Sequence, residues 1–225
     1  MVMPAPRRTL LILSALAVLL APSRAWANEP SQPGRFDYYV LVLTWMPTHC
    51  RSEGRNRRDG QCDTHKSRAF LLHGLWPQYE KGWPENCPIG KRPWVPAKVI
   101  DEMRGIMPSK SLIIHEYRVH GTCSGLDPAQ YFGVARELFE RVTVPPQLLG
   151  PEVDHLDSPD EIEGEFLATN PWLEPEMIAV TCRRRNLLDV RVCFGRDLFP
   201  RACGVNEDQK RLCPLRKIAV PPVTP

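Results

Sequence analysis

The eight cysteines of this 225-residue chain limit its fold more than any other feature. All of them follow residue 49, and an even number of cysteines in an exported chain is typical of a complete set of disulfides. We therefore expect four disulfides and an oxidising compartment. Eight cysteines allow on the order of 100 pairings, so their spacing alone does not determine the connectivity. The residues concerned are Cys50, Cys62, Cys87, Cys123, Cys182, Cys193, Cys203 and Cys213.

The N-terminus has the pattern of a signal peptide. Arg7 and Arg8 precede an apolar run over residues 9–21, and Ala25-Trp26-Ala27 then supplies the small-x-small pattern of a cleavage site. The apolar run is shorter than the about 20 residues that a membrane span requires. A buried N-terminal helix would not need these three features in this order. We predict that residues 1–27 are removed after Ala27, which leaves a periplasmic or secreted protein without a membrane anchor.

The charge of the chain argues against binding of nucleic acid by overall attraction. The whole sequence has a formal charge of +3, but three of its 29 basic side chains lie in the predicted signal peptide, which contains no acidic residue. Cleavage leaves 26 basic side chains, which equals the 26 acidic ones. Any affinity for a polyanion must then come from a local site. The basic segment 51–68 and the acidic segment 152–165 could steer a polyanion or could simply be two solvated surface segments.

Local patterns predict an α+β fold, with a central and mostly antiparallel sheet flanked by helices in a single disulfide-bonded domain. We expect this domain over residues 28–216 and a flexible tail over residues 217–225. Strands are predicted at 36–45, 69–72, 177–182 and 187–194, the second of which delivers His73. Helices are predicted at 96–107, 111–120, 127–141 and 158–169. The second helix would have Ser111 as its N-cap and stop at Gly121, and segments 51–68 and 79–96 are expected to be loops.

Two short motifs contain three of the six histidines. HGLWPQ occupies residues 73–78, and HEYRVHGTC occupies residues 115–123. The second motif begins like the zinc-binding pattern H-E-x-x-H, in which two histidines four apart share one helix face, about 40° apart. Here that fourth position is Val119, and His120 would lie about 140° from His115 on a regular α-helix. A zinc site of this type is therefore not expected.

Acid–base chemistry by imidazoles remains as the best interpretation. The cysteines are expected to be oxidised, and the chain lacks the G-x-S-x-G signature of many serine hydrolases. Imidazole has a pKa near 6.5, so one histidine can act as a base while another acts as an acid. RNA suits such a pair because its ribose 2′-OH is already placed to attack the neighbouring phosphorus. The products would be a 2′,3′-cyclic phosphate and a free 5′-OH, formed without a metal or another cofactor.

These residues resemble the two active-site segments of the ribonuclease T2 family. FDYYVLVLTWMPTHC before the first motif, GWPENC after it and LLDVRVCFG near the end add to the similarity, which spans most of the mature chain. The resemblance implies that His73 is the general acid and His120 the general base, although the two labels could be exchanged. It also implies that His115 binds the phosphate and that Glu116 stabilises the transition state.

The sequence departs from the family pattern at two positions in the second motif. The family usually has a lysine immediately before the last histidine, and Val119 occupies that position here. Arg118 is adjacent, but one step along a helix turns the side chain by about 100°. We therefore expect weaker stabilisation of the transition state unless Arg118 or a loop arginine replaces the lysine. Tyr117 stands where the family more usually has tryptophan.

The resemblance also indicates a base-binding region and a set of disulfides. Trp76, Gln78, Tyr79 and Trp83 would bind bases with low specificity, although the two tryptophans could equally be ordinary packing residues. The remaining histidines, His49, His65 and His155, are expected to be surface or structural residues. The implied disulfides are Cys50–Cys62, Cys87–Cys123, Cys182–Cys213 and Cys193–Cys203.

Three functions compete at this point. The leading one is a monomeric endoribonuclease that acts on single-stranded RNA and not on DNA. The second is a secreted RNA-binding protein that has the same fold but is weakened or inactive as an enzyme, an alternative that Val119 leaves open. The third is a metal-dependent phosphoesterase, which a chelator would inactivate.

Overall fold

A computed structural model describes residues 31–52, 61–62, 68–150 and 155–223. The predicted signal peptide and its cleavage site lie outside the described residues, as does most of the basic segment 51–68. No helix in the described part of the chain is long and apolar enough to cross a membrane.

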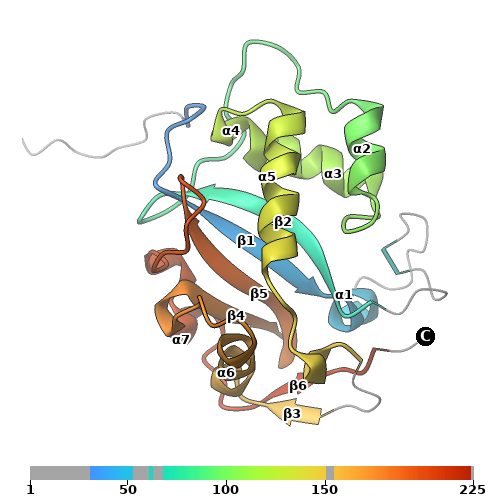
Figure 1. Cartoon of the computed structure of the whole chain (residues 1–225), viewed down its shortest axis with the longest axis vertical. Helices are drawn as coiled ribbons and strands as arrows, with labels where there is room; N and C mark the ends of the chain where they lie inside the picture. The colour runs from blue at the N-terminus through green and yellow to red at the C-terminus, as the bar shows by residue number, and fades with distance from the viewer. Residues whose placement is uncertain (1–30, 53–60, 63–67, 151–154, 224–225) are drawn as a thin grey trace, which may run out of the picture.

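A six-stranded sheet forms the centre of the molecule (Figure 1). Its main path runs in the order β2-β1-β5-β6-β3, and β4 pairs with β5 beside that path. All pairs are antiparallel except β5 with β6, so the predicted α+β class with a mostly antiparallel sheet is confirmed. The strands are β1 (Tyr38–Trp45), β2 (Phe70–Gln78), β3 (His155–Asp157), β4 (Ile178–Arg183), β5 (Asn186–Gly195) and β6 (Ile218–Val220).

The helices pack mainly against one face of this sheet, where α5 crosses in front of β1 and β2 (Figure 1). The two longest helices begin with complete capping boxes, Asp127 with Gln130 and Ser158 with Glu161, each followed by a proline. The helices are α1 (Met46–Ser52), α2 (Ala97–Met103), α3 (Lys110–Glu116), the π-helix η2 (Tyr117–Gly121), α4 (Thr122–Ser124), α5 (Pro128–Arg141), α6 (Pro159–Thr169) and α7 (Gln209–Leu212). Short 3₁₀ turns occur at η3 (Pro146–Leu148), η4 (Pro175–Met177) and η5 (Val205–Glu207).

Side chains of β1 alternate between the two faces of the sheet and so belong to two different clusters. Leu41, Leu43 and Trp45 face the helices and belong to the main hydrophobic core. Val40 and Val42 face the other way and form a smaller cluster with Tyr38, Cys193, Trp76 and Cys203. Trp76 of the first histidine motif thus lies on this second face.

Four sequence expectations need correction. β2 does not end before His73 but continues to Gln78, so the whole first motif is strand. Ser109, not Ser111, caps α3, since its hydroxyl accepts from the backbone N–H of Leu112. The helical segment also runs past Gly121 and stops at Gly125, which has a left-handed φ of +78°. The tail is not flexible throughout, because β6 pairs with β3.

Four disulfides join distant parts of the chain. They are Cys50–Cys62, Cys87–Cys123, Cys182–Cys213 and Cys193–Cys203, the pairs that the family resemblance implies. Cys87–Cys123 joins the loop after β2 to the helix that carries the second motif.

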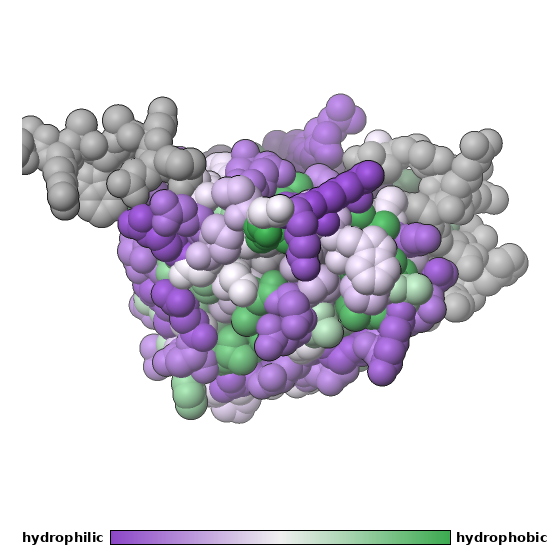
Figure 2. Space-filling model, turned by 90° about the horizontal axis from the view of Figure 1, so that it is seen from above, coloured by the Kyte–Doolittle hydropathy of each residue, from purple (hydrophilic) through white to green (hydrophobic). Residues whose placement is uncertain are grey.

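The face at the top of Figure 1 is mostly hydrophilic, with smaller hydrophobic areas between the polar side chains (Figure 2).

Candidate active site

The first motif lies on β2, next to β1 in the sheet. Val42 of β1 pairs with Gly74 and Leu43 pairs with Leu72, so His73 is the extra residue of a β-bulge. Bulges re-aim a side chain that would otherwise follow the alternation of the strand. The His73 side chain is 36% exposed, and its two ring nitrogens face different groups, Thr44 and Glu116.

The second motif lies on α3 and η2, where the helix changes from α to π geometry. The backbone N–H of Thr122 donates to the carbonyl of Tyr117, five residues earlier. A π turn contains more residues than an α turn, so residues five apart point in more similar directions than they do on a regular α-helix. The 140° separation expected for His115 and His120 on a regular α-helix therefore does not apply. His115 is instead close enough that its charge lowers the pKa of His120.

Trp76 joins the two motifs. Its indole Nε1–H donates to Glu116 Oε2 at 2.8 Å. Its ring stacks on His120 with 5.1 Å between centroids and meets His73 edge-on at 5.3 Å. The guanidinium carbon of Arg191 lies 5.2 Å from the indole centroid. Trp76 therefore holds the two histidines and the glutamate in one cluster. These contacts occupy part of the ring surface that was predicted to stack on a nucleobase.

Glu116 is the most buried member of the cluster, with only 1% of the side chain exposed. Its Oε1 lies 3.6 Å from His73 Nε2. Burial raises the pKa of Glu116 to about 8, and the hydrogen bond from Trp76 opposes this only in part. At neutral pH the resting carboxyl group is therefore largely protonated and can act as a hydrogen-bond donor.

Burial also makes both cluster histidines less basic. It lowers the pKa of His120 to about 3, and the charges of His73 and His115 act in the same direction. No hydrogen-bond partner for the buried Nδ1 of His120 exists among the described residues. The pKa of His73 is lowered as well, mainly by burial, but the Asp189 carboxylate raises it.

Three residues of this site lie outside the two histidine motifs and are not indicated by them. Thr44 lies between His73 and Asp189, and Arg191 lies over Trp76. Asp189 and Arg191 are two apart on β5 and therefore share a face. Two charges on one face of an otherwise apolar strand were a visible signal, but their position beside Thr44 and Val42 depends on strand register, which the sequence does not give. His49, expected to be a surface or structural residue, is also close enough to lower the pKa of His73.

The remaining predicted base-binding residues are not in this cluster. The Gln78 side chain is buried and accepts from Asn206, which also bonds Tyr79 and both backbone polar groups of Gly82. Tyr79 packs against the main core. Trp83 is 55% exposed and is free to offer a stacking surface. Gln78 and the backbone of Tyr79 thus hold the end of β2 and the following turn, and base binding by these two residues stays a prediction.

The two positions before His120 hold an apolar and an exposed basic side chain. Val119 is partly buried, and its backbone carbonyl accepts from the N–H of Asn86. Arg118 is exposed on η2. Arg191 is the arginine whose guanidinium lies on Trp76 and whose charge acts on His73.

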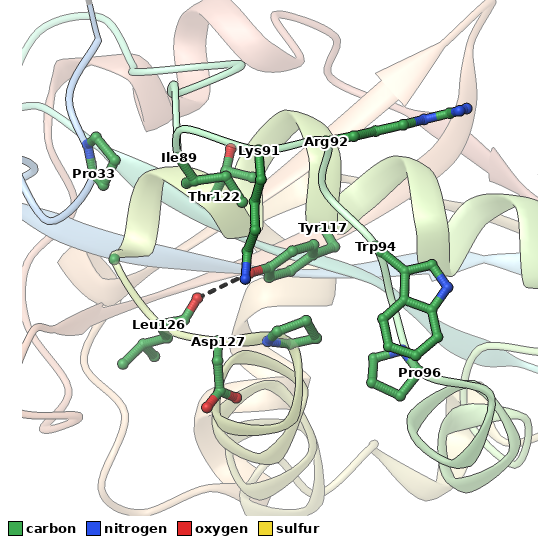
Figure 3. Close-up of a pocket in the computed structure, with 12 residues that line it drawn as sticks. Pro33, Ile89, Lys91, Arg92, Trp94, Pro96, Tyr117, Thr122, Leu126 and Asp127 are labelled. Atoms are coloured by element: carbon green, nitrogen blue, oxygen red, sulfur yellow. Dashed lines mark hydrogen bonds between the residues drawn. The ribbon is translucent and has the colours of Figure 1, made fainter.

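A separate cavity of about 530 Å³ lies beside the helix of the second motif (Figure 3). Lys91, Arg92 and Trp94 line one part of it, and the phenol of Tyr117 donates to the carbonyl of Leu126 at 3.1 Å. None of the four candidate catalytic residues lines this cavity.

Within the described ranges, no three His, Cys, Asp or Glu side chains are placed to hold a metal ion together. Cofactor-free chemistry stays a prediction, to be tested with a chelator.

Comparisons with known proteins place the chain in a group of relatives. A family model described as the ribonuclease T2 family matches residues 36–200. A ribonuclease of Aeromonas hydrophila is 37% identical over 138 residues, which are 61% of either chain. A probable ribonuclease of Haemophilus influenzae is 30% identical over 150 residues, which cover 61% of this chain and 52% of that protein. The match thus spans between one half and two thirds of the length of these relatives.

A solved structure has the same fold. The structure of trichomaglin, described as a novel S-like ribonuclease, matches 84% of this chain and 100% of its own with a TM-score of 0.66. The sequence identity over that match is 21%, so the likeness concerns the fold alone. The described helices and disulfides therefore surround a sheet of known architecture.

Proposed function

Because this chain belongs to the ribonuclease T2 family, we propose that it is an endoribonuclease that cleaves single-stranded RNA to a 2′,3′-cyclic phosphate. One observation carries the proposal. His73 and His120 both contact Trp76, and the buried Glu116 lies 3.6 Å from His73 and is hydrogen-bonded to the same indole. Two imidazoles can serve as the base and the acid in an internal attack by the 2′-OH, and a protonated carboxyl group can stabilise the charge that develops on the phosphate oxygens.

His120 acts as the general base. A base must be neutral before the reaction, and burial lowers the pKa of His120 to about 3. Within the described ranges, the charged groups that act on His120 are the two histidines His73 and His115, and both lower its pKa. Its ring is fixed against Trp76 and can take the proton of the 2′-OH while that oxygen forms a bond to phosphorus.

His73 acts as the general acid. Asp189 raises the pKa of His73, and the Glu116 carboxyl group lies next to Nε2. The approach of the substrate phosphate adds further negative charge, which favours the protonated imidazole. Nε2 then gives its proton to the departing 5′ oxygen as the P–O5′ bond breaks.

Glu116 and His115 stabilise the phosphate between these two steps. A Glu116 carboxyl group with a pKa of about 8 is protonated at neutral pH and donates to a non-bridging oxygen. His115 is exposed in the last turn of α3 and binds the phosphate from the solvent side. Arg191 supplies positive charge from the sheet side, in place of the lysine that is usual at Val119.

Single-stranded RNA is the substrate that this chemistry favours. DNA lacks the 2′-OH and has no internal nucleophile. A-form duplex holds the 2′-OH away from the line of attack, so a flexible strand reacts more readily. Trp83 offers a stacking surface that does not discriminate strongly between bases.

The four disulfides are consistent with an exported protein. Thiols in the cytosol are kept reduced, whereas the periplasm and the outside of the cell are oxidising. We propose that the chain acts there as a monomer after removal of residues 1–27. Mass spectrometry of the mature N-terminus and of the intact protein in solution tests both points.

The decisive experiment uses purified, oxidised protein with a single-stranded RNA oligonucleotide in EDTA. Mass spectrometry should show a 2′,3′-cyclic phosphate on one fragment and a 5′-OH on the other. The same oligonucleotide with one 2′-deoxy residue should resist cleavage at that site only. His120→Ala should lower kcat by about 10²–10⁴-fold and still bind RNA.

Each competing function predicts a different result. Loss of cleavage in EDTA would favour the metal-dependent phosphoesterase. RNA binding with no cleavage at any pH from 4 to 8 would favour the inactive binding protein. Cleavage by His120→Ala at the wild-type rate would contradict the assignment of the base.

A further inference from the structure

Three neighbouring strands hold a buried chain of hydrogen bonds behind His73. Thr44 on β1 lies opposite Asp189 on β5, and Thr181 on β4 lies opposite the same aspartate. The Thr44 hydroxyl donates to Asp189 Oδ1 at 2.6 Å, and the Thr181 hydroxyl donates to Oδ2 at 3.2 Å. The backbone N–H of Asp189 donates back to Thr181 Oγ1 at 3.0 Å. All three side chains are at most 7% exposed, so water does not compete for these bonds.

The number of protons available in this hydrogen-bonded network determines which atom donates and which accepts. A threonine hydroxyl has one proton and two acceptor sites. Thr44 gives that proton to the Asp189 carboxylate, which can only accept. The contact of 3.2 Å between Thr44 Oγ1 and His73 Nδ1 is therefore one in which the oxygen accepts and the nitrogen donates. His73 must carry a proton on Nδ1.

We infer that Thr44 and Asp189 are positioning residues for His73, which hold a proton on Nδ1 and leave Nε2 as the atom that exchanges a proton with the substrate. This inference rests on the proposed function, because it assigns the pair to a reacting imidazole. Nε2 is the nitrogen that faces Glu116 Oε1, at 3.6 Å. Free neutral imidazole in water prefers the tautomer with the proton on Nε2. The Nδ1–H tautomer of neutral His73 therefore depends on these hydrogen bonds.

The charges around His73 give Asp189 a second effect. His49 from α1, Arg191 from β5 and His115 from α3 all lower the pKa of His73, as does burial. The charge of His73 in turn lowers the pKa of His120 on η2. Glu116 from α3 lies beside Nε2 but is itself protonated over much of the neutral range. Asp189 raises the pKa of His73 and so favours the protonated acid that the reaction needs.

Long-range ¹H–¹⁵N NMR of protein labelled at histidine nitrogens tests the tautomer directly. A spectrum of His73→Gln identifies the His73 signals. Wild-type protein at a pH where His73 is neutral should show the pattern of a proton on Nδ1. Thr44→Val removes the hydroxyl at nearly constant shape and should shift the population towards a proton on Nε2, whereas Thr44→Ser should keep the wild-type pattern.

Kinetics on single-stranded RNA give an independent readout. Thr44→Val should lower kcat by about 10²-fold, and Thr44→Ser should restore most of the loss. Asp189→Asn should move the alkaline limb of the pH–kcat/KM profile to lower pH, because the group that raises the pKa of His73 is gone. Thr48→Val is the matched control, since Thr48 is 4% exposed and its hydroxyl has no partner within the described ranges.

Each outcome has a definite meaning. A proton on Nε2 in the wild-type protein, or an unchanged tautomer and kcat in Thr44→Val, would overturn the inference. If Asp189→Asn does not fold, Thr44→Val and Thr44→Ser still decide the question. If the wild-type protein does not cleave RNA, the proposed function fails, but the NMR result still tests whether Thr44 sets the tautomer.

Discussion

Gly74 in the first motif is required by a neighbouring side chain rather than by its backbone angles. A Cβ at this position would lie 2.0 Å from Glu116 Oε2 and 2.8 Å from Trp76 Nε1. The volume that any other residue would fill is therefore the volume in which the Glu116 carboxyl group and the indole N–H meet. The glycine of one motif thus allows the glutamate of the other to reach the sheet.

Gly74→Ala should accordingly displace Glu116 and lower kcat by about 10²-fold, the size of effect seen when one donor to a transition-state oxygen is lost. The variant should also be destabilised, because the methyl group has no space. Urea unfolding of Gly74→Ala, Glu116→Ala and the double variant forms a cycle. The double variant should be more stable than the sum of the single effects predicts, and simple additivity would show that the two positions do not compete for space.

The cation next to the phosphate is expected to be Arg191 and not Arg118. Arg191 lies on Trp76 and acts on His73, whereas Arg118 is exposed on η2. Arg191→Gln should lower kcat/KM by roughly tenfold, because an electrostatic contribution to the transition state is lost. Arg118→Gln should have little effect.

Arg191→Lys serves as the control for stability, because Arg191 also pairs with the buried Glu207 at 3.5 Å. It keeps the charge and should recover part of the activity. A larger loss in Arg118→Gln than in Arg191→Gln would instead assign the role of the usual lysine to Arg118.

At the scale of elements, the π turn of η2 is what turns His120 towards the other cluster residues. Gly121 lies within it, and a Cβ there would approach the Tyr117 ring to 2.5 Å and the Tyr131 ring to 3.1 Å. Tyr131 is fully buried and donates to the carbonyl of Leu75 on β2 at 2.7 Å, so it cannot move away easily. The geometry of η2 is thus coupled to the sheet through these two tyrosines.

Gly121→Ala should cost about 1–3 kcal/mol of unfolding free energy, the usual range for an extra methyl group in a full site. It should also lower kcat, because His120 is the preceding residue. Gly133→Ala is the matched control, since Gly133 lies in α5 with nothing within 4 Å of an added Cβ. That change should stabilise the protein by about 0.5–1 kcal/mol. Equal stabilities for the two alanine variants would contradict the coupling.

The sequence predicts those elements whose signals are local. The starts of α5 and α6 could be located because the capping residues and prolines stand next to each other in the chain. The π turn could not be predicted, since it differs from an α-helix by a shift of one residue in hydrogen bonding, which packing decides. β6 was missed because it has three residues and exists through its partner β3. The link from Thr44 to Asp189 depends on a register between strands 145 residues apart.

At the scale of the whole molecule, the buried titratable groups make opposite contributions to stability. Burial raises the pKa of Glu116 to about 8 and that of Glu163 to about 7, from an ordinary 4.5. The folded protein therefore holds protons that the unfolded chain has lost, and this stabilisation disappears as the pH rises through the folded-state values. His120 has a folded-state pKa of about 3, so its contribution rises from pH 3 to 6.5 and is constant above that.

Between pH 6.5 and 8 the carboxyl groups alone should control the trend among these residues, and the free energy of unfolding should fall. One fully titrating group contributes up to about 1.4 kcal/mol per pH unit. Glu116→Gln should make the fall less steep when urea unfolding is followed by circular dichroism at several pH values in this range. Glu161→Gln is the control. Lys217 and the Ser158 cap lower the pKa of the exposed Glu161 to about 2, so this carboxyl group does not titrate between pH 6.5 and 8. Its loss should change the free energy of unfolding by the same amount at each pH in this range and leave the pH dependence unchanged. A slope unchanged by Glu116→Gln would mean that Glu116 is ionised in the resting protein, and the step in which it donates to a phosphate oxygen would have to be abandoned.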